Sequence, residues 1–371
     1  MRQSDKQPAS TPIPNPSPVE GEGSRRGTSV NAYPHIDLRD PSSFPTRRVE
    51  AWKYTDLSRA LREIPPVSPH ADVAPGGPFA ALGGDELAVV NGHCESRSGL
   101  IAEGPGDHVA RLRFVSTADG TGHQAKVSVE VRAGASLLLL ESYEGRAAGY
   151  VSNVALDISL GQSARLTRVV IEDDAEDAVS IAAAEVSLGE GAHFLQTVLT
   201  TGAKLQRHET RLAHPGEGAE VRIDGLYLLD SARHSDLTSV VSHGGLNGVT
   251  SQLTKGVVRD TARGVFQGKI VVERGADGTD ARMGHHALIF GERAEIDAKP
   301  ELEIYADDVQ CAHGNTVGNL DESALFYMQQ RGIPADEARA LLTQAFLIEI
   351  VDRIEHEGAR EVVREWLEQR L

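Results

Sequence analysis

The residues with the clearest chemical potential form a short Cys-x-His segment in the last third of the chain. Cys311 and His313 lie two positions apart within Asp307–Gly314, on a segment that we expect to be extended. Side chains two apart on a strand point to the same side. Thiolate and imidazole suit iron, zinc or a sulfur-bearing species. Two ligands cannot close a four-coordinate site, so a metal here needs groups from elsewhere or from another chain. The alternative is a buried cysteine and a capping histidine before a helix at Asp321.

Other polar groupings are less specific. Asp307 and Asp308 are adjacent, so on a strand they face opposite sides and do not form an acid/base pair. His234, His243 and the pair His285–His286 are three groupings among 14 histidines, and we interpret them as satisfied surface or turn residues.

Several motifs are missing from the sequence. There is no GxxxxGK[ST] phosphate loop, and therefore no ATP site of the chain's own, and no HExxH, GxSxG or CxxC. The GxG pieces at Gly189 and Gly216 lie inside strand patterns rather than opening a helix, which argues against dinucleotide binding. Cys94 and Cys311 are the only cysteines, too few for a disulfide framework or a four-cysteine zinc site.

Composition narrows the class of protein. The chain has 371 residues, and 37 Lys and Arg against 54 Asp and Glu give a net charge of −17, which disfavours nucleic acid as a partner. Aromatics are only 5% and Gly numbers 37, a combination that suits many short strands and tight turns. No apolar run approaches the roughly 20 residues of a membrane span, and the N-terminus does not resemble a secretory signal. We therefore expect a cytoplasmic protein.

A repeat runs through the middle of the chain. Val127–Val131 and Val154–Leu160 alternate strictly between apolar and polar residues, as half-buried strands do. Small-residue turns recur, and their alanines are spaced by 29, 28 and 27 residues: Ala135, Ala164, Ala192 and Ala219. A weaker pair, Gly264 and Ala294, is spaced by 30. A period in the high twenties without intervening helices predicts a β-helix or related β-solenoid, in which each coil covers its neighbour.

The pattern divides the chain into four parts. Residues 1–43 are rich in Pro, Ser and Gly and predict a disordered tail. Residues 44–84 predict a helical segment and a Gly/Pro-rich linker, because Val49, Trp52, Leu57 and Leu61 recur at roughly helical spacing after a cap at Thr46. Residues 85–318 form the β-helix core.

Residues 319–371 predict a C-terminal helical domain. The expected helices cover Asp321–Gln330, a segment from Pro334, and a short piece after Gly358. The middle helix is apolar over so wide an arc that it is either part of a core or a partner surface.

These residues carry a family resemblance. Residues 299–314, with Thr316–Gly318, Leu320–Asp321 and Ala324–Tyr327, closely resemble the C-terminal signature of the SufB/SufD family of iron–sulfur cluster assembly proteins. Arg47–Thr55 resembles the N-terminal motif of the SufD branch. The middle of the chain is similar too, at His234, Ser251–Gly256 and Gly264–Gly268. The length and the lack of further cysteines favour SufD over SufB.

The resemblance implies a right-handed parallel β-helix flanked by helices. It implies a scaffold rather than an enzyme, which pairs with a SufB-like paralogue through the C-terminal end of the β-helix and docks a SufC-like ATPase on the C-terminal helices. By residue-level correspondence, His313 and Cys311 belong to a site for a transient iron–sulfur cluster shared with the partner. Leu237 stands where many relatives carry histidine, which weakens a ligand role for that strand.

Four matters stay open on the sequence alone. The resemblance does not indicate whether a flavin binds, or what donates the sulfur. A homodimer through the same interface is an alternative when the chain is alone. The alternative from another class is a β-helix enzyme acting on acidic polysaccharide, which the charge of −17 and the seven Tyr and two Trp disfavour.

Overall fold

The computed structural model describes residues 35–94, 99–214 and 216–371. The described residues belong to one compact unit. The predicted disordered tail lies, as far as residue 34, outside the described residues. Its last part, residues 35–43, contains Ile36 and Leu38, which are both buried.

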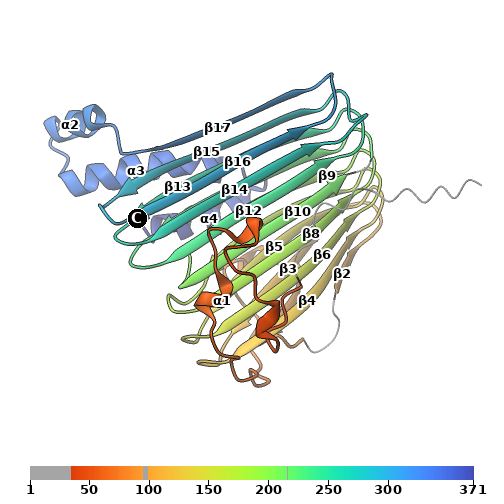
Figure 1. Ribbon diagram of the computed structural model, residues 1–371, viewed down its shortest axis with the longest axis horizontal. Helices are drawn as coiled ribbons and strands as arrows, with labels where there is room; N and C mark the ends of the chain where they lie inside the picture. Colours follow the sequence, from red (N-terminus) through yellow and green to blue (C-terminus); the bar gives the residue numbers. More distant parts are fainter. Residues whose placement is uncertain (1–34, 95–98, 215) are drawn as a thin grey trace, which may run out of the picture. The chain divides into compact units, whose positions relative to one another are not determined.

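The core is a parallel β-solenoid of about eight turns (Figure 1). Consecutive strands alternate between two sheets, and every strand pairs in parallel with the strand two positions along the chain. The nine-stranded sheet contains β1 (Asp85–Val90), β3 (Asp107–Ser116), β5 (Ser136–Gly145), β7 (Arg165–Asp173), β9 (His193–Thr200), β11 (Glu220–Leu229), β13 (Val249–Arg259), β15 (Asp280–Phe290) and β17 (Gln310–Gly318). The eight-stranded sheet contains β2 (Gly99–Ala102), β4 (Gly122–Val131), β6 (Val151–Leu160), β8 (Val179–Leu188), β10 (Leu205–His214), β12 (His234–His243), β14 (Arg263–Val272) and β16 (Glu295–Ile304). The prediction of a parallel β-solenoid is confirmed.

The sequence repeat corresponds to one coil of the solenoid. Each marker alanine directly precedes a strand of the nine-stranded sheet and is almost fully buried: Ala135, Ala164, Ala192 and Ala219. The strands that follow are in register, with Ser136 opposite Arg165. The weaker pair was not in register, because Gly264 lies opposite Ile296 rather than Ala294. The turn marker that precedes β14 is instead Ala262, which is fully buried.

The C-terminal helices are α2 (Glu322–Gln330), α3 (Ala335–Asp352) and α4 (Glu357–Glu368). Helices α3 and α4 cover the outer face of the nine-stranded sheet, whereas α2 projects past the ends of the strands (Figure 1). Leu347, Ile350 and Val351 of α3 and Trp366 of α4 pack in one apolar cluster with outward-facing strand residues such as Leu226. The wide apolar arc of α3 is therefore largely a core surface. No helix in the described ranges is long and apolar enough to cross a membrane.

The N-terminal segment covers part of the eight-stranded sheet. It contains only short helical turns: η1 (Pro41–Ser43), η2 (Glu50–Trp52), α1 (Leu57–Ala60) and η3 (Ala80–Leu82). Trp52 is fully buried and lies over the Arg207 guanidinium, 4.4 Å from its carbon to the ring centroid. Thr55 donates a hydrogen bond to Asp236 at 2.5 Å. The roughly helical spacing of apolar residues thus reflects contacts with distant strands, and Asp56 rather than Thr46 caps α1.

Candidate functional site

The terminal coil of the solenoid is open. Among the described strands, β17 pairs with β15 alone and β16 with β14 alone, so each presents one unpaired edge (Figure 1). All of β17 except Cys311 is exposed. An exposed strand edge carries a row of unpaired backbone donors and acceptors and is a template for pairing with another chain.

Cys311 and His313 both lie on this edge strand. They stand opposite Ala281 and Met283 of β15, whose side chains are buried inside the solenoid. The two predicted site residues therefore lie on the inward face of β17, as strand alternation requires. Cys311 is half-buried against the apolar interior, and His313 is exposed. The structure brings them together on one face of one strand.

The surroundings define the chemistry of this pair. Burial raises the pKa of the Cys311 thiol, and Asp280 adds to the increase by repelling a thiolate. The raised pKa keeps Cys311 a neutral thiol near pH 7 unless a nearby positive charge favours the thiolate. Among the described residues, no group of three or more His, Cys, Asp or Glu side chains could hold a metal. The pair therefore remains an incomplete ligand set.

The alternative of a capping histidine is wrong. Helix α2 is capped by Asp321, whose side chain accepts a hydrogen bond from the Ser323 backbone N–H at 2.8 Å. His313 lies eight positions earlier, within β17. Asp307 and Asp308 are exposed in the turn before β17 and not on a strand as expected.

The other histidines singled out in the sequence have hydrogen-bond partners, but most of them are buried rather than on the surface. His234, His243 and His285 are all buried in strands and all hydrogen-bonded, so their interpretation as surface or turn residues was wrong. His286 bonds Thr316 of the edge strand at 2.8 Å on the outer face. Leu237 is buried inside the solenoid, where it lines a small cavity.

A buried ionic cluster inside the solenoid was not predicted. Arg168 makes two hydrogen bonds to Glu141, at 2.7 and 2.8 Å, and both side chains are fully buried. Glu172 lies 2.7 Å from His208, and burial together with the charge of Glu141 raises the pKa of Glu172 to about 8. The sequence does contain one sign of this cluster, which is a charged residue at an inward-facing position of an otherwise apolar strand. Arg168 is such a residue, because it lies between the inward-facing Leu166 and Val170.

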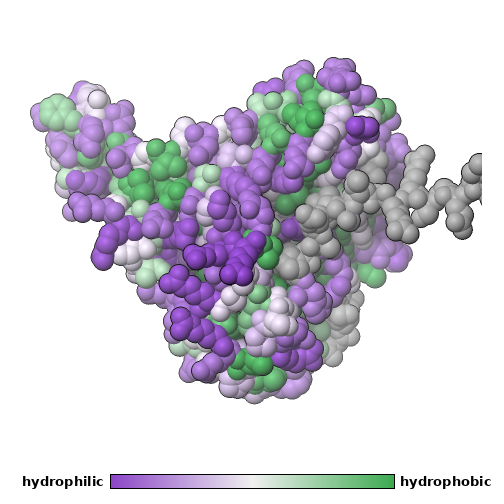
Figure 2. Space-filling view, in the orientation of Figure 1, coloured by the Kyte–Doolittle hydropathy of each residue, from purple (hydrophilic) through white to green (hydrophobic). Residues whose placement is uncertain are grey.

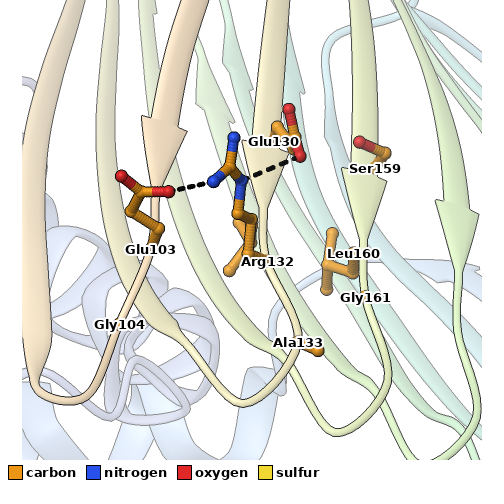
Figure 3. Close-up of a pocket in the computed structure, with 9 residues that line it drawn as sticks. Glu103, Gly104, Glu130, Arg132, Ala133, Ser159, Leu160 and Gly161 are labelled. Carbon is orange, nitrogen blue, oxygen red and sulfur yellow. Dashed lines mark hydrogen bonds and ion pairs between the residues drawn. The ribbon is translucent and has the colours of Figure 1, made fainter.

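A surface hollow lies at the opposite end of the coil stack from β17. Figure 3 shows Arg132 of the β4 corner between Glu103 and Glu130, with both of which it forms ion pairs. These side chains are about half exposed, and the single guanidinium offsets only one of the two carboxylate charges. The hollow contains neither Cys311 nor His313, and we assign it no role.

The fold and the edge define a parallel β-solenoid protein with a Cys–His pair on an unpaired terminal strand. The family model for the SUF system FeS cluster assembly SufBD core domain matches residues 114–346, more than half of the chain, including both site residues. The chain belongs to this SufB/SufD family and is most like SufD.

Individual relatives agree with this assignment. The iron–sulfur cluster assembly protein SufD of Escherichia coli is 29% identical over 95% of this chain and 95% of its own length. A SufBD family protein of Synechocystis is 32% identical over 66% of this chain and 56% of its own length. SufD of Bacillus subtilis is 32% identical over 37% of this chain and 31% of its own length. The family membership speaks against the alternative of a polysaccharide-acting enzyme.

Proposed function

We propose that this chain is a non-catalytic scaffold subunit of a SufBCD-type complex that assembles iron–sulfur clusters. In this proposal its terminal coil pairs with a SufB-like paralogue, and the C-terminal helices dock a SufC-like ATPase. The observation that carries the proposal is the position of Cys311 and His313 on the unpaired strand β17. A chain that pairs with this edge comes close enough to supply the missing ligands. We expect the complex to work in the cytoplasm.

The two side chains have complementary tasks in this proposal. His313 offers an imidazole nitrogen from an exposed position, where it can reach iron without reorganising the fold. Cys311 loses its proton as iron binds, because the metal charge offsets the burial that raises the thiol pKa. The nascent cluster is the cargo of this site.

The His313→Ala variant tests the shared site. Co-expressed with its SufB-like and SufC-like partners and purified without oxygen, the complex is expected to carry roughly tenfold less iron and acid-labile sulfide than wild type, as is typical when a metal centre loses a well-placed group. His286→Ala is the matched control, since His286 also lies in the last coils but faces outward. An intact complex with a normal cluster content in the His313→Ala variant would remove His313 from the mechanism.

The ATPase-docking surface requires surface variants rather than a truncation. Deleting residues 335–371 removes α3 and α4, which cover the nine-stranded sheet, and thereby exposes its apolar face. Helix α2 instead presents Phe326 and Tyr327, which are 63% and 59% exposed. Figure 2 shows hydrophobic residues among hydrophilic ones where α2 and α3 extend past the strands. We therefore place the docking contact on α2 and the adjoining part of α3.

The double variant Phe326→Ser/Tyr327→Ser is expected to weaken ATPase binding at least about tenfold, because exposed aromatic anchors dominate interface energetics. Isothermal titration of the purified proteins measures this change. Ile101→Ser, an exposed apolar residue at the other end of the solenoid, serves as the control. Unchanged affinity in the double variant contradicts docking on α2.

The open edge also bears on the state of the chain alone. The same unpaired strands can pair with a second copy, so a homodimer is expected where no SufB-like partner is present. Sedimentation of the isolated chain, compared with an equimolar mixture with the partner, distinguishes the homodimer from the heterodimer.

A further inference from the structure

His285 is a buried histidine next to the candidate site, and its ring is fixed on three sides. Its Nε2 lies 2.8 Å from the Tyr227 hydroxyl, and its Nδ1 lies 2.7 Å from Oδ1 of Asn315. The ring stacks on Phe266 with centroids 4.7 Å apart and planes 3° from parallel. His285 is fully buried, whereas Asn315 is exposed on the edge strand β17.

In the series Tyr227, His285 and Asn315, each residue donates a hydrogen bond to the next. Burial raises the pKa of the Tyr227 phenol, so its O–H is present and donates to His285 Nε2. Burial lowers the pKa of His285 to about 4, so the ring is neutral and its single N–H is on Nδ1. That N–H donates to Oδ1 of Asn315, which fixes the carboxamide. Among the described residues, none accepts a hydrogen bond from Asn315 Nδ2, so both of its N–H groups can donate to a bound ligand.

Two glycines create the space that this arrangement needs. A Cβ at Gly256 would lie 1.9 Å from the Tyr227 ring, and one at Gly264 would lie 2.6 Å from it. Real Cβ atoms do not approach that closely, so Tyr227 reaches His285 only because both positions are glycine. The two glycines thus leave the space that the series of hydrogen bonds from Tyr227 through His285 to Asn315 requires.

Asn315 shares the face of β17 that carries the predicted ligands. Cys311, His313 and Asn315 alternate along one strand and stand opposite Ala281, Met283 and His285. Successive members of such a row are about 7 Å apart, so a cluster held at His313 is within reach of the Asn315 amide. The net charge of the chain is −17, which disfavours a bound anionic cluster. Hydrogen-bond donors that are neutral, such as an amide, stabilise the cluster without adding negative charge.

We propose that Asn315 is a third member of the edge site, and that its Nδ2 donates a hydrogen bond to an anionic sulfur of the cluster, a sulfide or a thiolate. His285 is then a positioning residue that orients the Asn315 carboxamide from inside the solenoid. This inference rests on the proposed function. Hydrogen bonds to cluster sulfur stabilise the more reduced form and raise the reduction potential.

Three variants in the co-expressed complex test the inference. Asn315→Ala removes the amide, and Asn315→Asp keeps an acceptor for His285 but removes the donors. His285→Phe keeps the stacking on Phe266 but removes the bond that orients Asn315. Each is expected to make the reduction potential of the cluster more negative and to speed the loss of iron to a chelator about tenfold. The double variant His285→Phe/Asn315→Ala should change no further than either single variant.

The matched control is His286→Phe, which loses an equivalent bond to Thr316 on the outer face of the same two strands. It is expected to leave the potential and the chelation rate unchanged. If the His285 variant does not fold, the two exposed Asn315 variants still decide the matter. A wild-type potential and chelation rate in both Asn315 variants overturns this inference alone. A wild-type complex without any cluster overturns the proposed function and this inference with it.

Discussion

Arg168→Met is expected to lower the free energy of unfolding by about 3–5 kcal/mol. Arg168 is fully buried, binds Glu141 through two nitrogens and donates a third hydrogen bond to Gln196 at 2.6 Å. Methionine has a similar length but no charge, so Glu141 is left buried without its partner. Glu172, whose pKa burial and Glu141 already raise to about 8, offers no compensation.

Urea unfolding followed by circular dichroism measures this change. The control is Arg132→Met, because Arg132 also forms ion pairs with glutamate but is half exposed, and its loss is expected to change the unfolding free energy by at most about 1 kcal/mol. The double variant Arg168→Met/Glu141→Leu is expected to recover much of the lost stability, since no unpaired charge then remains inside the solenoid. A single Arg168→Met variant as stable as the Arg132→Met control contradicts the prediction.

The coil architecture could be predicted from the sequence because it is repeated locally. Each coil requires a small buried residue at the same corner, and Ala135 to Ala219 display that requirement at an almost constant spacing. The position of Cys311 and His313 on one strand face followed from strand alternation. The open edge itself depends on where the last coil ends, and the change to a helical pattern from Asp321 onward predicted that end.

The buried polar residues could not be predicted because their partners lie one or two coils away. Arg168 and Glu141 are 27 positions apart, and Tyr227 and His285 are 58 positions apart. A pattern within one strand shows only an inward polar residue, which is equally consistent with a misassigned strand. The apolar spacing of the N-terminal segment was misleading for the same reason, because Trp52 packs on Arg207, which is distant in sequence.

Lowering the pH from 7 to 5 is expected to reduce the free energy of unfolding by about 4 kcal/mol, because neutral histidines are buried in the solenoid. Burial lowers the pKa of His123, His234 and His285 to about 4, and that of His208 and His243 to about 3. In the unfolded chain these side chains gain protons as the pH falls through about 6.5. Between the two values the unfolded state binds more protons, so stability falls as the pH falls.

Three buried carboxyl groups act in the opposite direction. Burial raises the pKa of Glu172 to about 8 and that of Asp174 and Asp224 to about 6. Between about pH 4 and these values the folded state holds protons that the unfolded chain has lost, so these groups alone favour folding at lower pH. Near pH 5 the histidine effect is the larger one, and the unfolded state binds about two more protons than the folded state. The free energy of unfolding then changes by roughly 3 kcal/mol per pH unit. Near pH 7 the two sets cancel, which places the stability maximum there.

Urea unfolding at pH 5, 6, 7 and 8 measures the profile. His123→Gln is expected to reduce the slope near pH 5 by about one proton. Glu172→Gln removes a group that gives up its proton only near pH 8, so it should flatten the decline between pH 7 and 8. Equal stability at pH 5 and pH 7 would show that the buried histidines are charged in the folded state, and the hydrogen-bond direction assigned to His285 would then be wrong as well.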